Sequence, residues 1–423
     1  MKILIVGHGA REHAIAAALH RSHSQPRLFA YMSTPNPGIK ALVEDWRKGA
    51  LDDIRTLATY AMEVKPEFVV FGSERPLAAG AVDLLEEQGI PCIGPRRLLA
   101  QIEASKLFMR NFMARNIGRG SPRWRIFRDL GAVKRYLEEH PNVVLKPIGL
   151  TGGKGVRIIG KHLFNIDQVL QYAEECLRKD GEILLEERLE GEEFSLMVFT
   201  DGRKVLPMPI VQDYKYAYEG DNGPMTGGMG SYSCANHLLP FLTKEDVEAA
   251  LEIVKETIIS LGREIGIPYK GILYGQFIQT QDGPKVIEFN ARFGDPEAMN
   301  VLSIMKSDLV DVFSFIITGD LVEPVEFADE ATVCRYLVPE GYPEKPKIGQ
   351  EFSLPVQELS ALGIEIYFGS VSETDGKYVT TSSRSVALLA KGSTLGTAKA
   401  LLDKAFSQYR SSGLYFRSDI PGL

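Results

Sequence analysis

Residues 2–20 read KILIVGHGAREHAIAAALH, an apolar run followed by a glycine turn and then by apolar residues at helical spacing. A buried strand, a Gly-x-Gly turn and a helix in this order are typical of nucleotide-binding α/β domains. The dinucleotide-binding form needs a third glycine at position 12, where this chain has Glu12, and an acidic residue at the end of the second strand, which LFAYMSTPNPG lacks. The stretch therefore predicts a Rossmann-like turn whose helix N-terminus, with Arg11 beside it, suits one phosphate and a ribose better than a dinucleotide.

The same alternation continues to about residue 95. KILIV, RLFAYM, FVVFG and PCIG are predicted strands, with helical stretches between them near residues 10–20, 52–64 and 77–88. Such alternation predicts a parallel sheet with helices on both faces. A helical run at 101–116, QIEASKLFMRNFMARN, is followed by glycines and a proline that predict a linker.

Beyond the linker the pattern changes to mixed α+β structure. NVVLKP and GVRIIG are predicted to form an antiparallel pair, followed by a helix at 166–178 and strands at EILLEE and 194–199. A long polar, glycine-rich stretch, QDYKYAYEGDNGPMTGGMGSYS, leads to a helix near 244–264 and a hairpin, GILYGQFIQTQDGPKVIEFN. The last hundred residues have weaker strand patterns and end in a predicted helix at 397–409.

The loop KPIGLTGGKGV (146–156) carries the first chemical signal. Its glycines allow backbone N–H groups to approach phosphate oxygens closely, and its two lysines add positive charge. It is not a Walker A loop, because no Ser or Thr follows Lys154 and a strand comes next. A flexible hairpin tip is the alternative interpretation.

The strand VIEFN carries the second signal. Side chains alternate across a strand, so Glu288 and Asn290 share one face, and their oxygens suit a hard cation that bridges polyphosphate oxygens. If hairpin residues pair with numbers summing to 564, Gln276 lies opposite Glu288 on that face. A shift of one residue would bury Gln276 instead, and an exposed polar strand face is the alternative to a metal site.

An acidic connection, residues 186–193 of ILLEERLEGEEFSL, separates two strands and forms a weaker third signal. Backbone groups in such a connection can bind an adenine edge, and a carboxylate there can hold ribose hydroxyls. Most acidic loops, however, are only solvated.

Composition sets the limits on function. The 423 residues carry a formal net charge of −7, with no block of Lys or Arg, so we expect neither a nucleic-acid nor a membrane partner. The four cysteines form no C-x-x-C pair, which favours a reducing compartment. No apolar run approaches the length of a membrane span or a signal-peptide core, so we expect a cytoplasmic protein.

A lysine-bearing helix, a lysine–glycine loop, an acidic connection and an E-x-N strand, in this order, resemble the ATP-grasp superfamily. Enzymes of this superfamily hold ATP between two α+β subdomains and activate a carboxylate as an acyl phosphate. Five further strings resemble the phosphoribosylamine–glycine ligase family: GHGAREH (7–13), GSERPL (72–77), QDYK (212–215), DNGPMTGGMGSYS (221–233) and NARFGDPE (290–297). With a C-terminal segment near YFRSDI, the resemblance covers essentially the whole chain.

The resemblance implies a multidomain α/β and α+β fold. The expected parts are an N-terminal Rossmann-like domain that binds phosphoribosylamine (1–104), an ATP-grasp domain (105–325) with a mobile lid subdomain (about 121–189), and a small mixed C-terminal domain (326–423). It also implies the activity: ATP, glycine and phosphoribosylamine give glycinamide ribonucleotide, ADP and phosphate through a glycyl phosphate, with Mg²⁺ or Mn²⁺. A monomer is expected.

The resemblance also implies site residues. Lys106 and Lys146 are expected at the ATP phosphates, and the acidic connection at the nucleoside. The full set expected to bind ATP is Lys106, Lys146, Gly152, Gly153, Lys154, Gly155, Glu187, Leu189 and Glu193. The expected metal ligands are Gln276, Glu288 and Asn290.

Arg292 is expected to stabilise charge on the transferring phosphoryl group, and Asp213 and Asp295 to hold the glycine ammonium, with helix or turn capping as the alternative for Asp295. The residues expected to carry catalysis are Arg292, Lys146 and Asp295. The residues expected to bind the two other substrates are Gly9, Arg11, Glu12, Asp213, Lys215, Thr226, Gly227, Gly228, Arg292 and Asp295.

Three alternatives remain beside this interpretation. A dehydrogenase is disfavoured by Glu12, as above. Another ATP-grasp carboxylate–amine ligase of the purine pathway, using formate or bicarbonate, is disfavoured by the DNGPMTGGMG string. A catalytically dead nucleotide-binding protein would be expected to lack Lys146 or the Glu288/Asn290 pair. Arg75 differs from the residue that is common at this position in the family, and it adds a cation beside the expected sugar-phosphate pocket.

Overall fold

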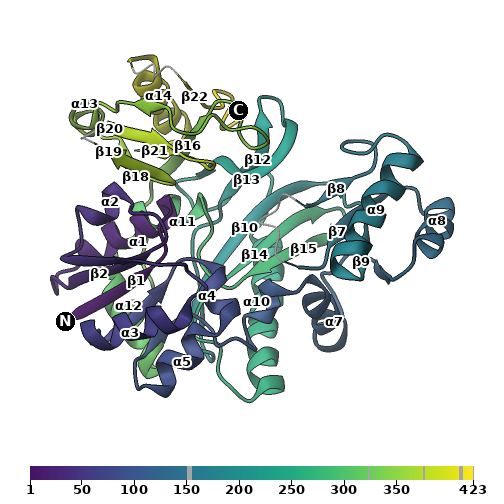
Figure 1. Cartoon of the computed structure of the whole chain (residues 1–423), viewed down its shortest axis with the longest axis horizontal. Helices are drawn as coiled ribbons and strands as arrows, with labels where there is room; N and C mark the ends of the chain where they lie inside the picture. The colour runs from purple at the N-terminus through teal and green to yellow at the C-terminus, as the bar shows by residue number, and fades with distance from the viewer. Residues whose placement is uncertain (150–154, 323, 375–376, 409–412, 423) are drawn as a thin grey trace.

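A computed structural model describes residues 1–149, 155–322, 324–374, 377–408 and 413–422 (Figure 1). The chain begins with a five-stranded sheet in the order β3-β2-β1-β4-β5, and its strands are parallel, as predicted, although β3 was not among the predicted strands. Its strands are β1 (Lys2–Val6), β2 (Arg27–Met32), β3 (Asp45–Lys48), β4 (Phe68–Phe71) and β5 (Cys92–Ile93). Its helices are α1 (Ala10–His20), α2 (Pro37–Lys40), α3 (Ile54–Val64), α4 (Glu74–Ala79) and α5 (Ala81–Glu87).

Alternate residues of β1 face two different hydrophobic cores. Leu4 and Val6 belong to the core formed with α3 and α5, whereas Ile3 and Ile5 belong to the core formed with α1. The second core also contains residues of α11 (Glu297–Ser303) and α12 (Leu309–Thr318), which come from the middle of the chain. The sheet therefore has helices on both faces, and one face packs against the elements that follow the E-x-N strand.

The helical run at 101–116 was expected as one helix, and this was wrong. The structure has two helices, α6 (Gln101–Ala104) and α7 (Lys106–Asn116), separated by Ser105 in an extended conformation. The Ser105 hydroxyl accepts a hydrogen bond from the Phe108 amide and caps α7. The break places Lys106 at the first position of α7.

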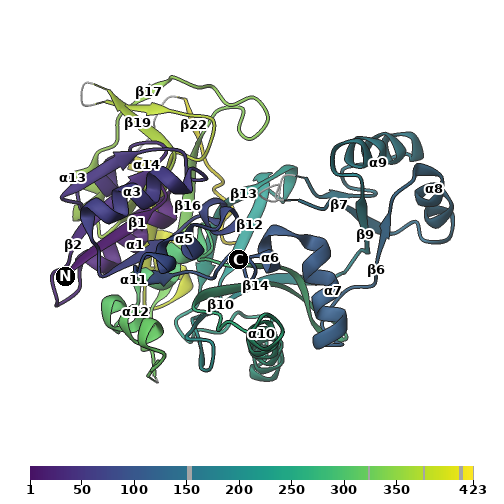
Figure 2. The same ribbon diagram turned by 60° about the horizontal axis from the view of Figure 1, so that its bottom comes forward.

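The lid subdomain is a small sheet with its own core, and it projects from one side of the molecule (Figures 1 and 2). The strand order is β6-β9-β7-β8, and the predicted antiparallel pairing of β7 with β8 is confirmed. Its elements are β6 (Trp124–Phe127), α8 (Leu130–Glu139), β7 (Val143–Pro147), β8 (Arg157–Ile158), α9 (Ile166–Asp180) and β9 (Ile183–Glu187).

A four-stranded antiparallel sheet in the order β11-β10-β14-β15 lies between the lid and the body of the protein. The elements are β10 (Glu192–Thr200), β11 (Val205–Pro207), α10 (Lys244–Ile265), β14 (Gly271–Thr280) and β15 (Gly283–Asn290). Gln276 pairs with Glu288, so of the two registers left open by the sequence the structure has the one that places these residues opposite each other.

The polar, glycine-rich stretch forms a hairpin of β12 (Gln212–Tyr218) and β13 (Asn222–Ser233), called the ribbon below. β13 pairs with β16 (Ala331–Pro339), so the ribbon continues into a sheet with the C-terminal strands β21 (Val386–Gly392) and β18 (Glu365–Phe368). The remaining C-terminal elements are β17 (Glu351–Phe352), α13 (Val356–Ala361), β19 (Val371–Thr374), β20 (Lys377–Thr380), α14 (Leu395–Gln408) and β22 (Leu414–Tyr415). Among the described residues, no helix is both long and apolar enough to cross a membrane.

The separate core of the lid predicts that it can lose structure independently. Leu145 is completely buried in that core, so Leu145→Ala should cost about 3 kcal/mol. Hydrogen exchange should show faster exchange of β7 and β9 amides and unchanged protection of β1 and β4 amides. Val144→Ala, which truncates a half-buried neighbour on the same strand, is the control. Equal loss of protection in β1 would contradict an independent lid.

Candidate active site

Three buried charges meet where the lid joins the central sheet. Lys146 on β7 places its Nζ 2.6 Å from Glu186 Oε2 on β9. Arg110 on α7 donates from Nε and Nη2 to both Glu186 oxygens, at 2.5 and 3.0 Å. Burial would raise the pKa of Glu186, but Arg110 and Lys146 outweigh burial and lower this pKa to about 2. Glu186 is therefore a permanent anion that fixes both cations.

The Arg110 guanidinium also binds the strand that carries the E-x-N motif. Its Nη1 donates to the Val286 carbonyl at 2.9 Å and its Nη2 to the Ile287 carbonyl at 2.8 Å. These are the two carbonyls just before Glu288 on β15. Arg110 therefore connects Lys146 in the lid to Glu288 in the central sheet.

Lys106 lies close to the phosphate-loop candidates. Its Nζ donates to the Gly149 carbonyl at 3.0 Å, and burial lowers the pKa of its ammonium. The Gly155 carbonyl accepts a hydrogen bond from the Tyr172 hydroxyl. The predicted residues Gly152, Gly153 and Lys154 lie outside the described residues.

Glu288 is surrounded by cations. Burial would raise the pKa of its carboxyl, but the pKa is lowered by four cations: Lys215, Lys106, Lys146 and Arg292. From the described residues its side chain accepts no hydrogen bond. A carboxylate with free lone pairs can bind a metal ion while the cations near it bind an anionic polyphosphate, so the donor chemistry fits Mg²⁺ or Mn²⁺.

Arg292 is held beside the metal candidates. Its Nη2 donates to Asn290 Oδ1 at 3.0 Å and lies 2.9 Å from Glu103 Oε1. Glu103 Oε2 also accepts the Ala291 amide at 2.7 Å. Burial raises the pKa of Glu103 to about 7, although Arg292 acts in the opposite direction. Glu74, from the GSERPL string, lies 3.7 Å from Arg292 Nε.

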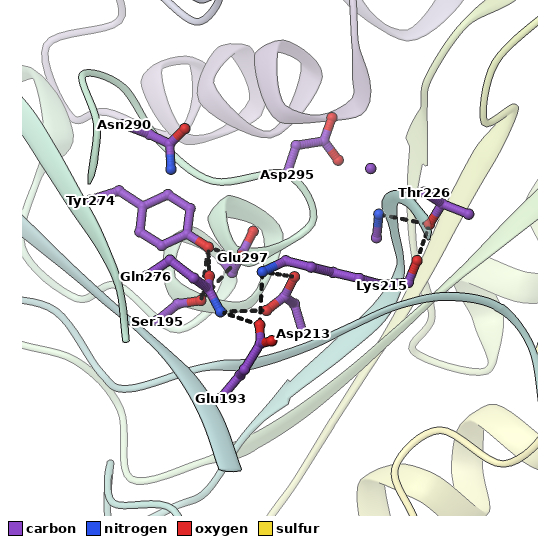
Figure 3. Close-up of polar contacts among 12 residues, drawn as sticks. Glu193, Ser195, Asp213, Lys215, Thr226, Tyr274, Gln276, Asn290, Asp295 and Glu297 are labelled. Carbon is purple, nitrogen blue, oxygen red and sulfur yellow. Dashed lines mark hydrogen bonds and ion pairs between the residues drawn. The ribbon is translucent and has the colours of Figure 1, made fainter. Parts of the chain in front are cut away.

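Gln276 lies within a second polar cluster (Figure 3). Its Nε2 donates to Glu193 Oε2 at 3.1 Å and Asp213 Oδ1 at 3.3 Å, while its Oε1 accepts a bond from Ser195 at 3.1 Å and another from Tyr274. Both ends of the amide are thus engaged by protein groups. The structure pairs Gln276 with Glu288 in register but directs its oxygen toward Ser195 and Tyr274.

Lys215 completes this cluster. Its Nζ is 2.9 Å from Glu193 Oε2 and 3.8 Å from Asp213 Oδ2. Burial lowers the pKa of Lys215, but Asp213 and Glu193 outweigh burial and hold it above its usual value. Burial also raises the pKa of Asp213 to about 7, against the influence of Lys215.

A cavity lies where the first glycine turn faces the C-terminal domain. Its lining includes His8, Arg11, Asp295, Ser370, Ser383 and Arg384. Arg11 is bound through Nε to Glu12 and through Nη1 to the Phe293 carbonyl at 3.2 Å. Glu12 also accepts the Gly9 amide, so its carboxylate shapes the turn.

Asp295 is held by the C-terminal domain. Its Oδ1 accepts the Tyr336 hydroxyl at 2.5 Å, and its Oδ2 lies 3.0 Å from Arg384 Nη2. Arg384 Nη1 donates to the Gly227 and Gly228 carbonyls at 2.8 and 2.9 Å. The Asp295 side chain therefore joins two domains, and the described structure shows no capping bond from it.

Comparison with known proteins identifies the family. Models for the phosphoribosylglycinamide synthetase N domain, ATP-grasp (A) domain and C domain match residues 1–103, 104–298 and 332–422. This chain belongs to the phosphoribosylglycinamide synthetase family. Phosphoribosylamine–glycine ligase of Methanocella arvoryzae is 45% identical over 421 residues, which cover 99% of this chain and 96% of that protein. The Pyrococcus furiosus ligase is 44% identical, with 99% and 94% covered.

Solved structures agree with this family. The crystal structure of phosphoribosylamine–glycine ligase from Thermotoga maritima superposes with a TM-score of 0.83 at 27% identity, covering 99% of this chain and all of that chain. Biotin carboxylase from Campylobacter jejuni, solved with β-γ-ATP, has a TM-score of 0.76 at 14% identity, with 98% and 92% covered. At that identity the second likeness shows a shared fold.

The acidic connection lies at the edge of the lid of this synthetase-family chain. Glu187 directs its carboxylate outward to Arg123, whose Nε is 2.6 Å from Glu187 Oε2. The Glu187 side chain is therefore paired with another residue of the lid subdomain. Backbone groups near Glu187 and Leu189 stay the predicted adenine contacts.

Sequence reasoning missed several residues that hold the predicted ones in place. Glu186 and Arg110 had a signal, because each is a charged residue within an otherwise apolar pattern, and buried charges are almost always paired. Glu297, which accepts hydrogen bonds from Tyr274 and Ser195 at 2.7 and 3.1 Å, was part of the NARFGDPE string. Arg384 and Glu103 had no local signal.

The network at Lys146 predicts the effect of removing its anion. Glu186→Gln leaves two buried cations without their counter-charge and should cost about 3–5 kcal/mol in unfolding free energy. Because Lys146 then loses its anchor, kcat/KM for ATP should fall at least about tenfold. Glu182→Gln, which removes a surface partner of Arg128 in the same subdomain, is the control for both measurements. Unchanged ATP kinetics in Glu186→Gln would contradict this role.

Proposed function

We propose that this chain joins glycine to 5-phosphoribosylamine, with ATP converted to ADP and phosphate, to give glycinamide ribonucleotide for purine biosynthesis. The observation that carries the proposal is the Glu288 carboxylate, which accepts no hydrogen bond from the described residues and whose pKa is lowered by four cations, in a chain whose residues 1–298 and 332–422 match the synthetase family models. An ADP-forming carbon–nitrogen ligase needs such a site, because two anions, a polyphosphate and a carboxylate, must meet there.

The chemistry follows from the poor electrophilicity of a carboxylate. Transfer of the γ-phosphoryl group to glycine gives glycyl phosphate, whose phosphate is a good leaving group. The sugar amine then attacks the acyl carbon, an amide bond forms, and phosphate departs with the electron pair of the broken C–O bond. Such transfer depends on positioning and on charge neutralisation.

The positive charge that the protein supplies for this neutralisation comes from Lys106, Lys146 and Arg292. In this proposal the two lysines bind ATP phosphates and Arg292 faces the transferring group. Glu288 and Asn290 would hold Mg²⁺ or Mn²⁺, which when bound neutralises polyphosphate charge. Gln276 stays the third proposed ligand. Like Asn290, whose oxygen accepts Arg292, it has an oxygen that accepts hydrogen bonds, from Ser195 and Tyr274, while its Nε2 donates to Glu193 and Asp213.

The two remaining substrates are assigned to the body of the protein. Asp213 and Asp295 are the proposed anions for the glycine ammonium, with Lys215 held beside them by Glu193. The cavity beside Gly9 and Arg11 is the proposed phosphoribosylamine site.

In that cavity Arg11 is the cation offered to the sugar phosphate, while Glu12 positions Arg11. Thr226 shapes the adjoining loop, because its hydroxyl donates to the Lys215 carbonyl at 2.8 Å and accepts the Gly228 amide at 3.0 Å. Gly227 and Gly228 complete that wall. The proposal includes the domain limits given above, a monomer, and a cytoplasmic location.

A coupled substrate assay tests the function. The purified protein should form ADP and phosphate only when glycine and freshly generated phosphoribosylamine are both present, and the product should be glycinamide ribonucleotide by mass. Equal turnover with formate or bicarbonate in place of glycine would favour another carboxylate–amine ligase. Hydride transfer from a nicotinamide would overturn the proposal.

The metal assignment makes a separate prediction. Glu288→Ala should abolish Mg²⁺- or Mn²⁺-dependent turnover and leave the fold intact, because it removes a charge from a polar site. Circular dichroism and unfolding midpoints check the fold. Glu256→Ala, which removes only the surface partner of Arg119, is the control. Full activity of Glu288→Ala would exclude Glu288 as a ligand.

A further inference from the structure

The C-terminal segment around YFRSDI lies along the ribbon as far as Gly422 (Figure 1). Arg417 is buried, and its Nη1 donates to the Tyr216 carbonyl at 3.0 Å and to Asp221 Oδ1 at 2.7 Å. Its Nε and Nη2 bind Asp419 at 2.9 and 2.6 Å. The guanidinium also lies 5.2 Å from the centre of the Tyr214 ring. One side chain thus forms hydrogen bonds with both the middle and the tip of the ribbon.

Backbone amides of the ribbon and of the C-terminal segment add further hydrogen bonds. Asp419 accepts the Gly220 amide at 2.9 Å, and the Gly422 amide donates to the Tyr214 hydroxyl at 3.0 Å. The segment is itself fixed to β16, because β22 pairs with Val338 and Pro339 and the Ile420 carbonyl accepts Arg335 Nε at 2.6 Å. The segment therefore joins the ribbon to the C-terminal domain.

The ribbon needs an external support at this point. Tyr214 pairs with Gly230, but Tyr216 pairs with Met225, so between these pairs β12 contributes only Lys215 while β13 contributes residues 226–229. The interrupted part of the ladder is therefore the part that carries Lys215 and the Thr226–Gly228 loop. Such irregularities aim side chains, but they leave backbone groups without ladder partners.

We propose that Arg417 is a positioning residue for the substrate site, acting through the Tyr216 carbonyl to hold Lys215 in line with Glu193 and Asp213. The C-terminal segment, residues 414–422 and called the clasp below, then fixes the irregular part of the ribbon. This rests on the proposed function, in which Asp213 and the Thr226–Gly228 loop face glycine and phosphoribosylamine. Arg417 itself touches neither Lys215 Nζ nor the carboxylates around it in the described structure.

Two variants remove the clasp from opposite ends. Arg417→Gln removes the cation, and Asp221→Asn removes only the anion at the ribbon tip. Asp221 has a positive φ of 53°, which asparagine tolerates well. Both should lower kcat/KM for glycine, at saturating ATP, by about 10- to 100-fold for Arg417→Gln and by less for Asp221→Asn. Arg417→Lys should restore part of the loss, because one ammonium can reach Tyr216 or Asp419 but cannot match the fork.

The second measurement needs no substrate. Hydrogen exchange of the full-length protein should show faster exchange of amides 212–226 in Arg417→Gln, with β14 and β15 amides unchanged. Glu351→Gln is the matched control, because it breaks the exposed Lys377–Glu351 pair in the same domain and contacts neither the ribbon nor the C-terminal segment. It should change neither ribbon exchange nor glycine kinetics.

The outcomes separate this proposal from the function itself. If wild-type protein forms no glycine-dependent ADP while ribbon exchange rises in Arg417→Gln, the clasp stands and the proposed function falls. Unchanged ribbon exchange in Arg417→Gln overturns the clasp. A loss of activity in Glu351→Gln equal to that in Arg417→Gln also overturns it, because the effect would then be general loosening of the C-terminal domain.

Discussion

The buried ion triad of Arg110, Glu186 and Lys146 is the interaction on which the nucleotide half of the site depends. A charge taken out of water is costly unless partners surround it, and here one carboxylate faces two cations. Arg110 also donates to the Val286 and Ile287 carbonyls, so only one arrangement of the triad makes all of these hydrogen bonds. That arrangement sets how the lid lysine stands relative to the Glu288 strand, and a phosphoryl-transfer site needs this kind of fixed geometry.

Much of the fold could be predicted because its signals are local. Four apolar residues, Ile3 to Val6, mark the buried strand β1. The pairing of Gln276 with Glu288 stayed open, because a β-bulge between Gln276 and Phe277 shifts the register set at the turn. The ribbon could not be recognised as two strands, because its outward polar face and its glycines serve the site and hide the alternation. The break before Lys106 was missed although Ser105 is a good N-cap residue, since the helical pattern on both sides of it is continuous.

The residues of the candidate site divide in the same way, into those with a local sequence signal and those without one. The lysine–glycine loop pointed to Lys146, the E-x-N strand to Glu288 and the NARFGDPE string to Arg292. In the structure Lys146 and Arg292 both act to lower the pKa of Glu288. Arg110 was missed although a charge within an apolar pattern marked it, whereas Glu103 and Arg384 had no local signal. Partners far away in the sequence give no local pattern: Arg110 binds Glu186, 76 residues later, and Arg384 binds Gly227, 157 residues earlier. For Glu12 and Gln276 the substrate and metal roles stay predictions, and the structure adds hydrogen bonds that they accept from Gly9 and from Ser195, which spacing does not reveal.

The two halves of the site are therefore supported from different ends of the chain. The nucleotide half depends on Arg110 before the lid, whereas the ribbon is held at its loop by Arg384 and near its tip by Arg417, both from the C-terminal domain. β16 strengthens this second support, since it pairs with β13 and with β22. In the proposed reaction a glycyl phosphate formed in one half reacts with an amine bound in the other, so each half needs its own support. The two supports meet along the segment from Glu288 on β15 to Asp295 in the turn that follows this strand.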